Sequence, residues 1–155
     1  MIKKLEEKVM ELNNKLPQLP TSTQASLAGF FWILAIIAIV INIMGIIAVL
    51  GIGAISNLAL FSAGFGYMTV NIWIMVITGV IGMGITVIME LMALKPLKEK
   101  KYRGWYISFC AVWLGLIFSV IYDIFSHSFG SIFQSVISLA ISLYLLAQVR
   151  DHFTT

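Results

Sequence analysis

Four long runs of apolar residues divide the chain, and each is long enough to cross a membrane as a helix. A transmembrane helix needs about 20 mostly apolar residues to cross about 30 Å of hydrocarbon. The runs cover residues 27–51, 70–94, 105–124 and 132–149. Membrane-spanning strands would alternate in polarity over segments of about ten residues, whereas these runs are continuous. The pattern therefore predicts an all-α membrane protein with four transmembrane helices.

Residues 1–16 follow a different pattern, in which apolar residues recur at spacings of three and four among Lys and Glu. The apolar positions are Ile2, Leu5, Val9, Leu12 and Leu16. Pro17 and Pro20 end the predicted helix, because the residue before a proline disfavours helical geometry. We interpret this segment as an amphipathic helix lying on the membrane surface. Self-association, or docking onto another protein, is the alternative that the heptad spacing leaves open.

The two patterns together define the organisation of the chain. Residues 1–20 form an amphipathic segment, and residues 21–155 form a single four-span domain. The composition agrees, since 60% of the 155 residues are hydrophobic, 11% are charged, and the mean hydropathy is +0.99. Soluble domains carry about 25% charged residues. A soluble globule, a disordered chain and a disulfide scaffold are therefore excluded, the last also because Cys110 is the single cysteine.

All ten basic residues fall on one side of a four-span arrangement. Four precede the first apolar run, five lie between the second and third, and one follows the fourth: Lys3, Lys4, Lys8, Lys15, Lys95, Lys98, Lys100, Lys101, Arg103 and Arg150. Positively charged loops are retained in the cytoplasm. We therefore expect both termini to be cytoplasmic in a multi-pass protein of the cell membrane, with a bacterial cytoplasmic membrane as the expected location.

The loop at residues 95–104, KPLKEKKYRG, concentrates half of this charge next to the bilayer. We interpret it as a topology determinant that also contacts anionic lipid head groups. The candidate contacts are Lys95, Lys98, Lys100, Lys101 and Arg103. A dedicated site for an acidic head group is the alternative. The cluster is too short and too close to the bilayer to indicate nucleic-acid binding.

The segment from Ile52 to Thr69 contains no charged residue and three glycines. It is too short to span, so we expect a loop that caps the outer end of the bundle. An interfacial or partly re-entrant segment is the alternative.

Each predicted span carries a stripe of small or polar residues at helical spacing. The stripes are Ala28, Ala35, Ala38, Asn42 and Gly45; Gly79, Gly82, Thr86 and Glu90; Ser108, Ala111, Gly115, Ser119 and Tyr122; and Ser131, Ser135, Ser138 and Ser142. Membrane helices pack through small residues, because these allow their backbones to approach closely. The stripes therefore predict the inward faces of a compact bundle, and the alternative is that they line a pore or substrate path.

Two residues on these stripes are candidate intramembrane polar sites. Asn42 lies near the predicted midplane, where an amide needs a hydrogen-bond partner. Glu90 lies on the small-residue face, and ionisable groups inside membranes are often functional. Because Glu90 is only five residues from Lys95, we favour the interpretation that it pairs with a basic side chain near the interface.

Signatures of enzymatic chemistry are absent from the sequence. The chain contains no GxSxG, HExxH or CxxC motif. Asp123 and His127 are four residues apart and suit one face of a helix end, but a metal site needs further ligands. We therefore predict no catalytic residue, no metal site and no cofactor.

An amphipathic first helix ending in KLPQLP, four spans and a final YLLAQVR resemble small four-span membrane proteins of bacteria. The resemblance covers most of the chain in pattern more than in motif, and it implies no activity for any residue. Our leading hypothesis is a non-enzymatic protein that acts by interactions in the bilayer, as a scaffold, an immunity-type protein or an accessory subunit. Its partners would be lipid and a membrane protein or a second copy. The alternative hypothesis is a small oligomeric ion or solute channel or transporter.

Overall fold

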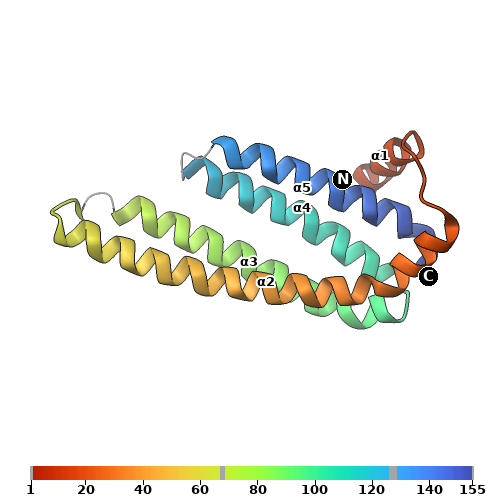
Figure 1. The fold of residues 1–155 in the computed structure, drawn as a ribbon, viewed down its shortest axis with the longest axis horizontal. Helices are drawn as coiled ribbons and strands as arrows, with labels where there is room; N and C mark the ends of the chain where they lie inside the picture. The colour runs from red at the N-terminus through yellow and green to blue at the C-terminus, as the bar shows by residue number, and fades with distance from the viewer. Residues whose placement is uncertain (1, 67–68, 126–128, 155) are drawn as a thin grey trace.

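The computed structural model describes residues 2–66, 69–125 and 129–154, and most of these are helical (Figure 1). The helices are α1 (Ile2–Asn14), α2 (Thr21–Ser62), α3 (Thr69–Lys98), α4 (Tyr102–Phe125), α5 (Phe129–Val149) and a short 3-10 helix, η2 (Arg150–His152). Helices α2 to α5 are each long and apolar enough to cross a membrane. The predicted fold class, four candidate transmembrane helices preceded by a short first helix, is confirmed.

The four long helices pack in chain order, α2 against α3, α3 against α4 and α4 against α5. Helix α5 also contacts α1 and α2. Figure 1 shows α1, both termini and the α3–α4 turn at one end of the bundle, which we call the basic end. At 1.5 Å per residue, α2 is about 63 Å long and α5 is about 32 Å long. The α2–α3 hairpin therefore extends beyond α4 and α5 at the far end (Figure 1).

The loop predicted from Ile52 to Thr69 is wrong, because α2 continues as a helix to Ser62. Gly53, one of the three glycines of the predicted loop, lies within the helix. Gly53 packs directly against the Val76 side chain of α3, where a β-carbon would collide with it. Glycine at this position serves the close approach of two helices and does not end one of them.

The actual end of α2 is set by Gly64, which adopts a left-handed backbone conformation with φ of +82°. The amide of Phe65 donates to the Leu60 carbonyl at 2.9 Å, and the amide of Gly64 donates to the Phe61 carbonyl at 3.1 Å. These two bonds form a Schellman motif, which satisfies the last helical carbonyls and needs a left-handed residue. Only six residues, 63–68, separate α2 from α3.

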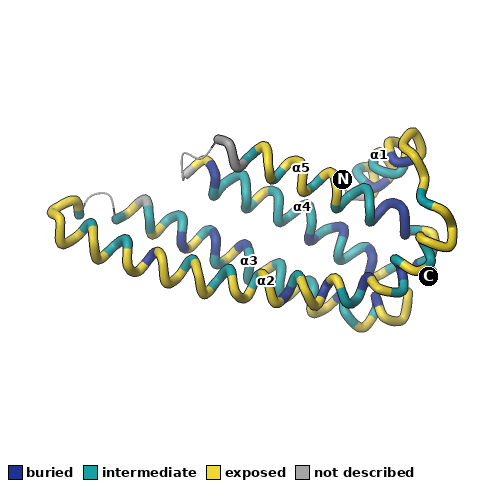
Figure 2. The backbone as a smooth tube through the Cα atoms, in the orientation of Figure 1, coloured by how far each residue is buried: buried dark blue, intermediate teal, exposed yellow. Residues whose placement is uncertain are grey.

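The hydrophobic core is concentrated at the basic end, where the residues coloured as buried in Figure 2 gather. Its buried members are Ala28, Phe31, Ala35, Ala93, Leu97, Trp105, Phe109, Leu146, Val149 and Phe153. Trp105 stacks on Phe109 with ring centroids 5.3 Å apart. Its indole nitrogen donates to the Leu146 carbonyl at 2.8 Å, so the polar edge of this buried ring is satisfied. The packing fills the space between all four long helices at this end.

The last residues of the chain belong to this core and are not a free tail. Phe153 is buried and meets Phe31 edge to face. The Thr154 amide donates to the Lys100 carbonyl, and the Thr154 carbonyl accepts from the Tyr102 amide. These bonds hold the α3–α4 turn, in which Lys100 has a φ of +52°.

Helix α1 packs against the basic end of its own bundle. Leu5 and Val9 contact the hydrophobic core, whereas Leu12 and Leu16 are exposed. The structure thus divides the apolar positions of the predicted seam between two environments. The side chain of Ile2 lies outside the part of the chain that the structure describes.

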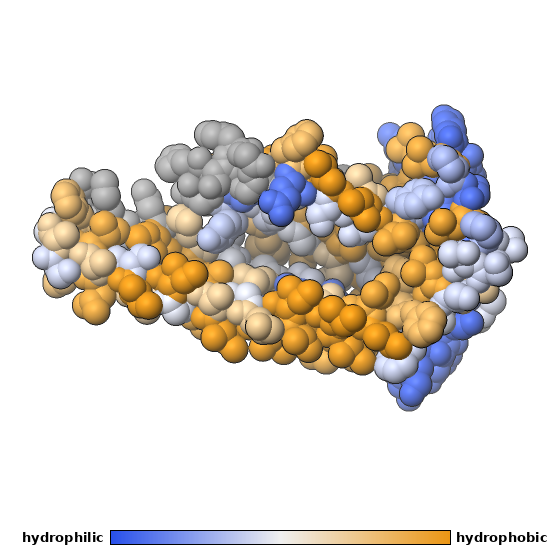
Figure 3. Space-filling model, viewed as in Figure 1, coloured by the Kyte–Doolittle hydropathy of each residue, from blue (hydrophilic) through white to orange (hydrophobic). Residues whose placement is uncertain are grey.

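Away from the basic end the outer surface is apolar, as Figure 3 shows along most of its length. Ile47 is 66% exposed, Ile55 is 71% exposed and Phe61 is 74% exposed. Residues 16–89 contain no Asp, Glu, Lys or Arg. A surface of this kind is compatible with lipid and not with water.

Candidate functional site: a cleft between the four long helices

A cleft of about 800 Å³ lies inside the bundle, between the four long helices. Figure 3 shows it as a hollow in the middle of the molecule, with paler, more polar residues inside an apolar rim. The predicted small-residue stripes supply much of its wall: Ala38, Asn42, Gly45, Gly79, Gly82, Thr86, Glu90, Ala111, Gly115, Ser119, Tyr122, Ser135, Ser138 and Ser142. The stripes therefore do face inward, but they line open space as well as helix contacts.

Other stripe residues are not part of the cleft wall that the structure describes. Ala28 and Ala35 are buried in the basic-end core. The side chain of Ser131 lies outside the residues that the structure describes.

Close helix contacts are confined to particular glycines. A β-carbon on Gly82 would lie 2.6 Å from two carbon atoms of Phe118 in α4, and one on Gly45 would lie 2.7 Å from the Met83 sulfur in α3. A β-carbon on Gly115 would meet nothing within 4 Å, although Gly115 also lies on a stripe. The small residues therefore bring α2, α3 and α4 together and leave the cleft beside them.

The cleft is closed at the basic end by the hydrophobic core and opens sideways between α2 and α5. These two helices meet at the basic end, where the Gln24 amide group donates to the Gln148 side-chain oxygen at 3.0 Å. Further along they form the two edges of the hollow seen in Figure 3. In a single chain the described residues therefore form a cleft that is closed at the basic end by the core and reached from the side, between α2 and α5.

Two polar groups in the cleft are satisfied by their own helix. Asn42, the first predicted intramembrane site, donates its side-chain amide to the Ala38 carbonyl at 2.9 Å. Thr86 donates its hydroxyl to the Gly82 carbonyl at 3.0 Å. The amide of Asn42 thus needs no partner on another helix, although it still presents a polar group to the cleft.

Glu90 is different, because the structure does not show the predicted pairing with a basic side chain. Across the described ranges, ion pairs involve Lys15, Lys101 and Arg150, and none reaches Glu90. Its carboxyl Oε2 is buried and has no hydrogen-bond partner. Glu90 lies four to five residues before the last turn of α3. The Lys95 side chain stays at the surface and therefore does not reach the Glu90 carboxyl group.

The helix contacts place Glu90 at the floor of the cleft. Gly82 is level with Phe118, and α3 and α4 are antiparallel, so Glu90 is level with about residue 110 or 111 of α4. Cleft-lining Ala111 lies at that height, and the core residue Ala93 lies one turn closer to the basic end. The carboxyl group is therefore at the boundary between the cleft and the packed core.

Hydroxyl groups and a second carboxylate lie toward the far end. The Ser119 and Ser135 hydroxyls are 2.5 Å apart, and Ser135 also donates to Asp123 at 3.4 Å. Asp123 is buried. His127, its predicted helix-end partner, lies outside the described residues. Within those residues, no group of three His, Cys, Asp or Glu side chains is close enough to hold a metal ion.

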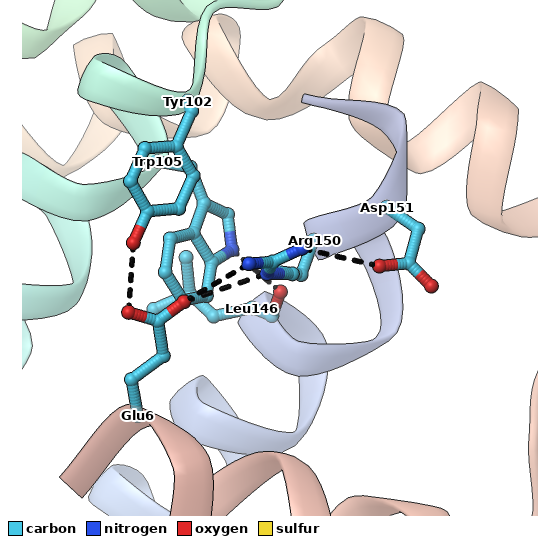
Figure 4. Close-up of polar contacts among 6 residues, drawn as sticks. All are labelled: Glu6, Tyr102, Trp105, Leu146, Arg150 and Asp151. Carbon is cyan, nitrogen blue, oxygen red and sulfur yellow. Dashed lines mark hydrogen bonds and ion pairs between the residues drawn. The ribbon is translucent and has the colours of Figure 1, made fainter. Parts of the chain in front are cut away.

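A separate polar cluster joins α1 to the basic end (Figure 4). The Glu6 carboxylate is buried, accepts from the Tyr102 hydroxyl at 2.7 Å and lies 3.4 Å from the Arg150 guanidinium. Arg150 also lies 3.6 Å from Asp151. The sequence analysis did not single out Glu6, because its partners are 96 and 144 residues away in the chain.

Gln148 makes a second link at the same end. Its side-chain oxygen accepts from the Leu19 amide and from Gln24, and its side-chain nitrogen donates to the Asn13 side chain, each at 3.0 Å. Asn13 and Gln148 are both buried. Helix α1 and the linker to α2 are therefore fixed to α5 by a buried polar residue that apolar periodicity does not reveal.

The five candidate lipid-contact residues, Lys95, Lys98, Lys100, Lys101 and Arg103, are all exposed at the basic end. Lys98 lies over the Trp32 ring, 5.3 Å from its centroid. Lys101 lies 2.6 Å from Glu99, and this hydrogen bond holds the pKa of Glu99 below its usual value. The exposed ammonium groups form a positive surface beside the ends of α3 and α4.

Comparisons of the chain with protein-family models, with curated protein sequences and with solved structures find no match.

Proposed function

We propose that the protein acts by non-covalent binding within the bilayer, without catalysing a reaction, and that the cleft between α2 and α5 is its binding site. The observation that carries the proposal is the shape of the cleft. It is closed toward the basic end by the hydrophobic core and open on one side, between α2 and α5. This shape suits a membrane-dissolved molecule that enters from the side. Ligand sites are typically concave, mostly apolar and about 300–1,000 Å³ in volume, and the cleft falls in this range.

Such a protein would serve as a scaffold, an immunity-type protein or an accessory subunit, with lipid and a membrane protein or a second copy as partners. In this proposal the basic end faces the cytoplasm, and the exposed lysines contact anionic head groups. The clustering of the α3–α4 turn, α1 and both termini at one end supports this orientation. Cysteines placed singly at Glu7 and Ser62, in a Cys110→Ser background, should react with an impermeant thiol reagent from opposite sides of the membrane.

The binding proposal is tested by filling the cleft. Gly115 lies in the cleft wall, whereas Gly84 does not, and a β-carbon on either residue meets nothing within 4 Å. Gly115→Phe should therefore fill the cleft, and Gly84→Phe is the matched control on a neighbouring helix. Native mass spectrometry from nanodiscs should show a bound amphiphile on the original chain and on Gly84→Phe, and its loss on Gly115→Phe. Equal retention by both variants would overturn the proposal.

Solute passage through an oligomer is the second candidate function. It is favoured by the presence of both Asn42 and Glu90 in the wall of one cleft. Because the core closes the cleft of a single chain, passage requires either assembly or opening of the basic end. Flux of ions and small solutes into proteoliposomes, blocked by Gly115→Phe, would support this candidate. Absence of flux across a broad panel would exclude it.

A further inference from the structure

Glu90 is the one residue with a formal charge among the described residues that line the cleft. The described part of the cleft wall includes no Lys, Arg or His, and the basic side chains of the α3–α4 turn are at the exposed end of the bundle. Any molecule that enters the cleft therefore meets a carboxyl group with no positive partner.

An unpaired carboxylate in a low-dielectric site is costly, and the cost falls when a positive group reaches it. Glu90 Oε2 is buried and has no hydrogen-bond partner among the described residues, so nothing that the structure describes compensates a charge on this carboxyl group. A neutral ligand relieves less of this cost, and an anionic ligand increases it. Charge complementarity thus selects a cation.

The remainder of the cleft wall decides what kind of cation fits. Most of the wall is apolar or small, and Phe118 and Tyr122 present aromatic rings to it. No group of three metal-ligating side chains exists in the part of the chain that the structure describes, so a bare metal ion would lack ligands. Aliphatic and aromatic walls instead suit the apolar body of an organic cation.

We propose that the cleft binds an amphiphilic cation, whose positive head lies at Glu90 and whose apolar part extends toward the opening between α2 and α5. This inference rests on the proposed function and specifies its ligand. The lateral opening gives the route, because an amphiphile dissolved in the bilayer can enter without crossing water. The floor position of Glu90 gives the orientation, with the head toward the basic end.

The test measures binding of dodecyltrimethylammonium to the full chain in phosphatidylcholine nanodiscs, below the micellar concentration of the probe. Empty nanodiscs give the partition into lipid, which is subtracted. Dodecyldimethylamine N-oxide is the neutral comparison, and dodecanesulfonate is the anionic one, with the same chain length. We expect saturable binding of the cation, weaker by at least about tenfold for the other two, which equals about 1.4 kcal/mol.

Variants then assign the selectivity to Glu90. Glu90→Gln keeps the shape of the side chain, and it should weaken cation binding by about tenfold or more while leaving neutral binding unchanged. Glu99→Gln removes an exposed charge outside the cleft and should change nothing. Gly115→Phe should abolish binding of all three probes.

The outcomes separate the two proposals. Equal binding of all three probes by the original chain, or unchanged cation binding by Glu90→Gln, overturns the cation proposal. If Gly115→Phe still removes that binding, the cleft remains the binding site. If no probe binds the original chain above the empty nanodisc, both proposals fail. Because the three-probe comparison uses the original chain, it does not depend on the folding of any variant.

Discussion

Replacing Gly82 by alanine should destabilise the bundle by forcing α3 and α4 apart. The added β-carbon would lie 2.6 Å from both Cβ and Cγ of Phe118. Ordinary carbon contacts are about 3.5–4.0 Å long, so one helix must move by about 1 Å. Rotation of the Phe118 ring does not help, because its β-carbon is fixed to the backbone of α4. Overpacking of this kind costs about 1–3 kcal/mol.

Gly84→Ala provides the control for the change in helix propensity. Gly84 lies in the same helix two residues away, and a β-carbon there meets nothing within 4 Å. Both variants gain the same preference of alanine over glycine in a helix, about 1 kcal/mol. The difference between the variants therefore isolates the steric cost. We expect Gly84→Ala to be more stable than Gly82→Ala by about 1–3 kcal/mol.

The measurement is the free energy of unfolding, obtained by titrating protein in a mild detergent with sodium dodecyl sulfate and following circular dichroism. The α3–α4 contact predicts a lower unfolding midpoint for Gly82→Ala than for Gly84→Ala. If the two variants unfold at the same midpoint, or if Gly82→Ala is the more stable, the close approach of Gly82 to Phe118 is refuted.

Three further predictions concern the basic end. Gln148→Met removes four hydrogen bonds to α1, its linker and α2, each worth about 1 kcal/mol. Amide exchange across residues 3–14 should therefore accelerate by at least about tenfold, whereas Glu11→Gln on the exposed face of α1 should not change it. Lys100→Gly should raise the unfolding free energy by about 1 kcal/mol, because Lys100 has a left-handed backbone conformation, which is strained for a residue with a side chain. Lys98→Gly, in the helix, should lower the unfolding free energy, and a loss of stability in Lys100→Gly would contradict the strain at Lys100. Replacing Lys95 and Arg103 together by Gln should reduce phosphatidylglycerol retained from mixed nanodiscs, by about 1 kcal/mol of lipid affinity per charge, as measured by mass spectrometry; unchanged retention would remove these residues as lipid contacts.

The number of spans and their inward faces follow from the sequence for simple physical reasons. Hydrocarbon requires long apolar helices, and close packing requires small residues at helical spacing. The same spacing does not show whether small residues meet a neighbouring helix or open space. Gly82 and Gly115 both lie on stripes and both line the cleft, yet a β-carbon on Gly82 would collide with Phe118 and one on Gly115 would meet nothing within 4 Å.

The docking of α1 could not be predicted, because it depends on contacts distant in sequence, and the end of α2 could not be predicted, because the sequence contains glycines both inside the helix and at its end. Gly53 stays helical since Val76 of another helix packs against it, whereas Gly64 ends the helix through a local backbone conformation. Residue type alone does not distinguish the two. Similarly, the apolar seam of residues 1–16 does not identify Glu6 and Asn13 as its buried polar positions.

The link between the two ends of the chain has a consequence for the order of synthesis. Asn13 is bonded to Gln148, 135 residues later, and Glu6 is paired with Arg150. Helix α1 is therefore translated before the groups of α5 and η2 that hold it. At about 5–20 residues per second, the interval is roughly 7–30 s. During this time α1 can reach Tyr102 but neither Gln148 nor Arg150, so its full attachment follows the synthesis of α5.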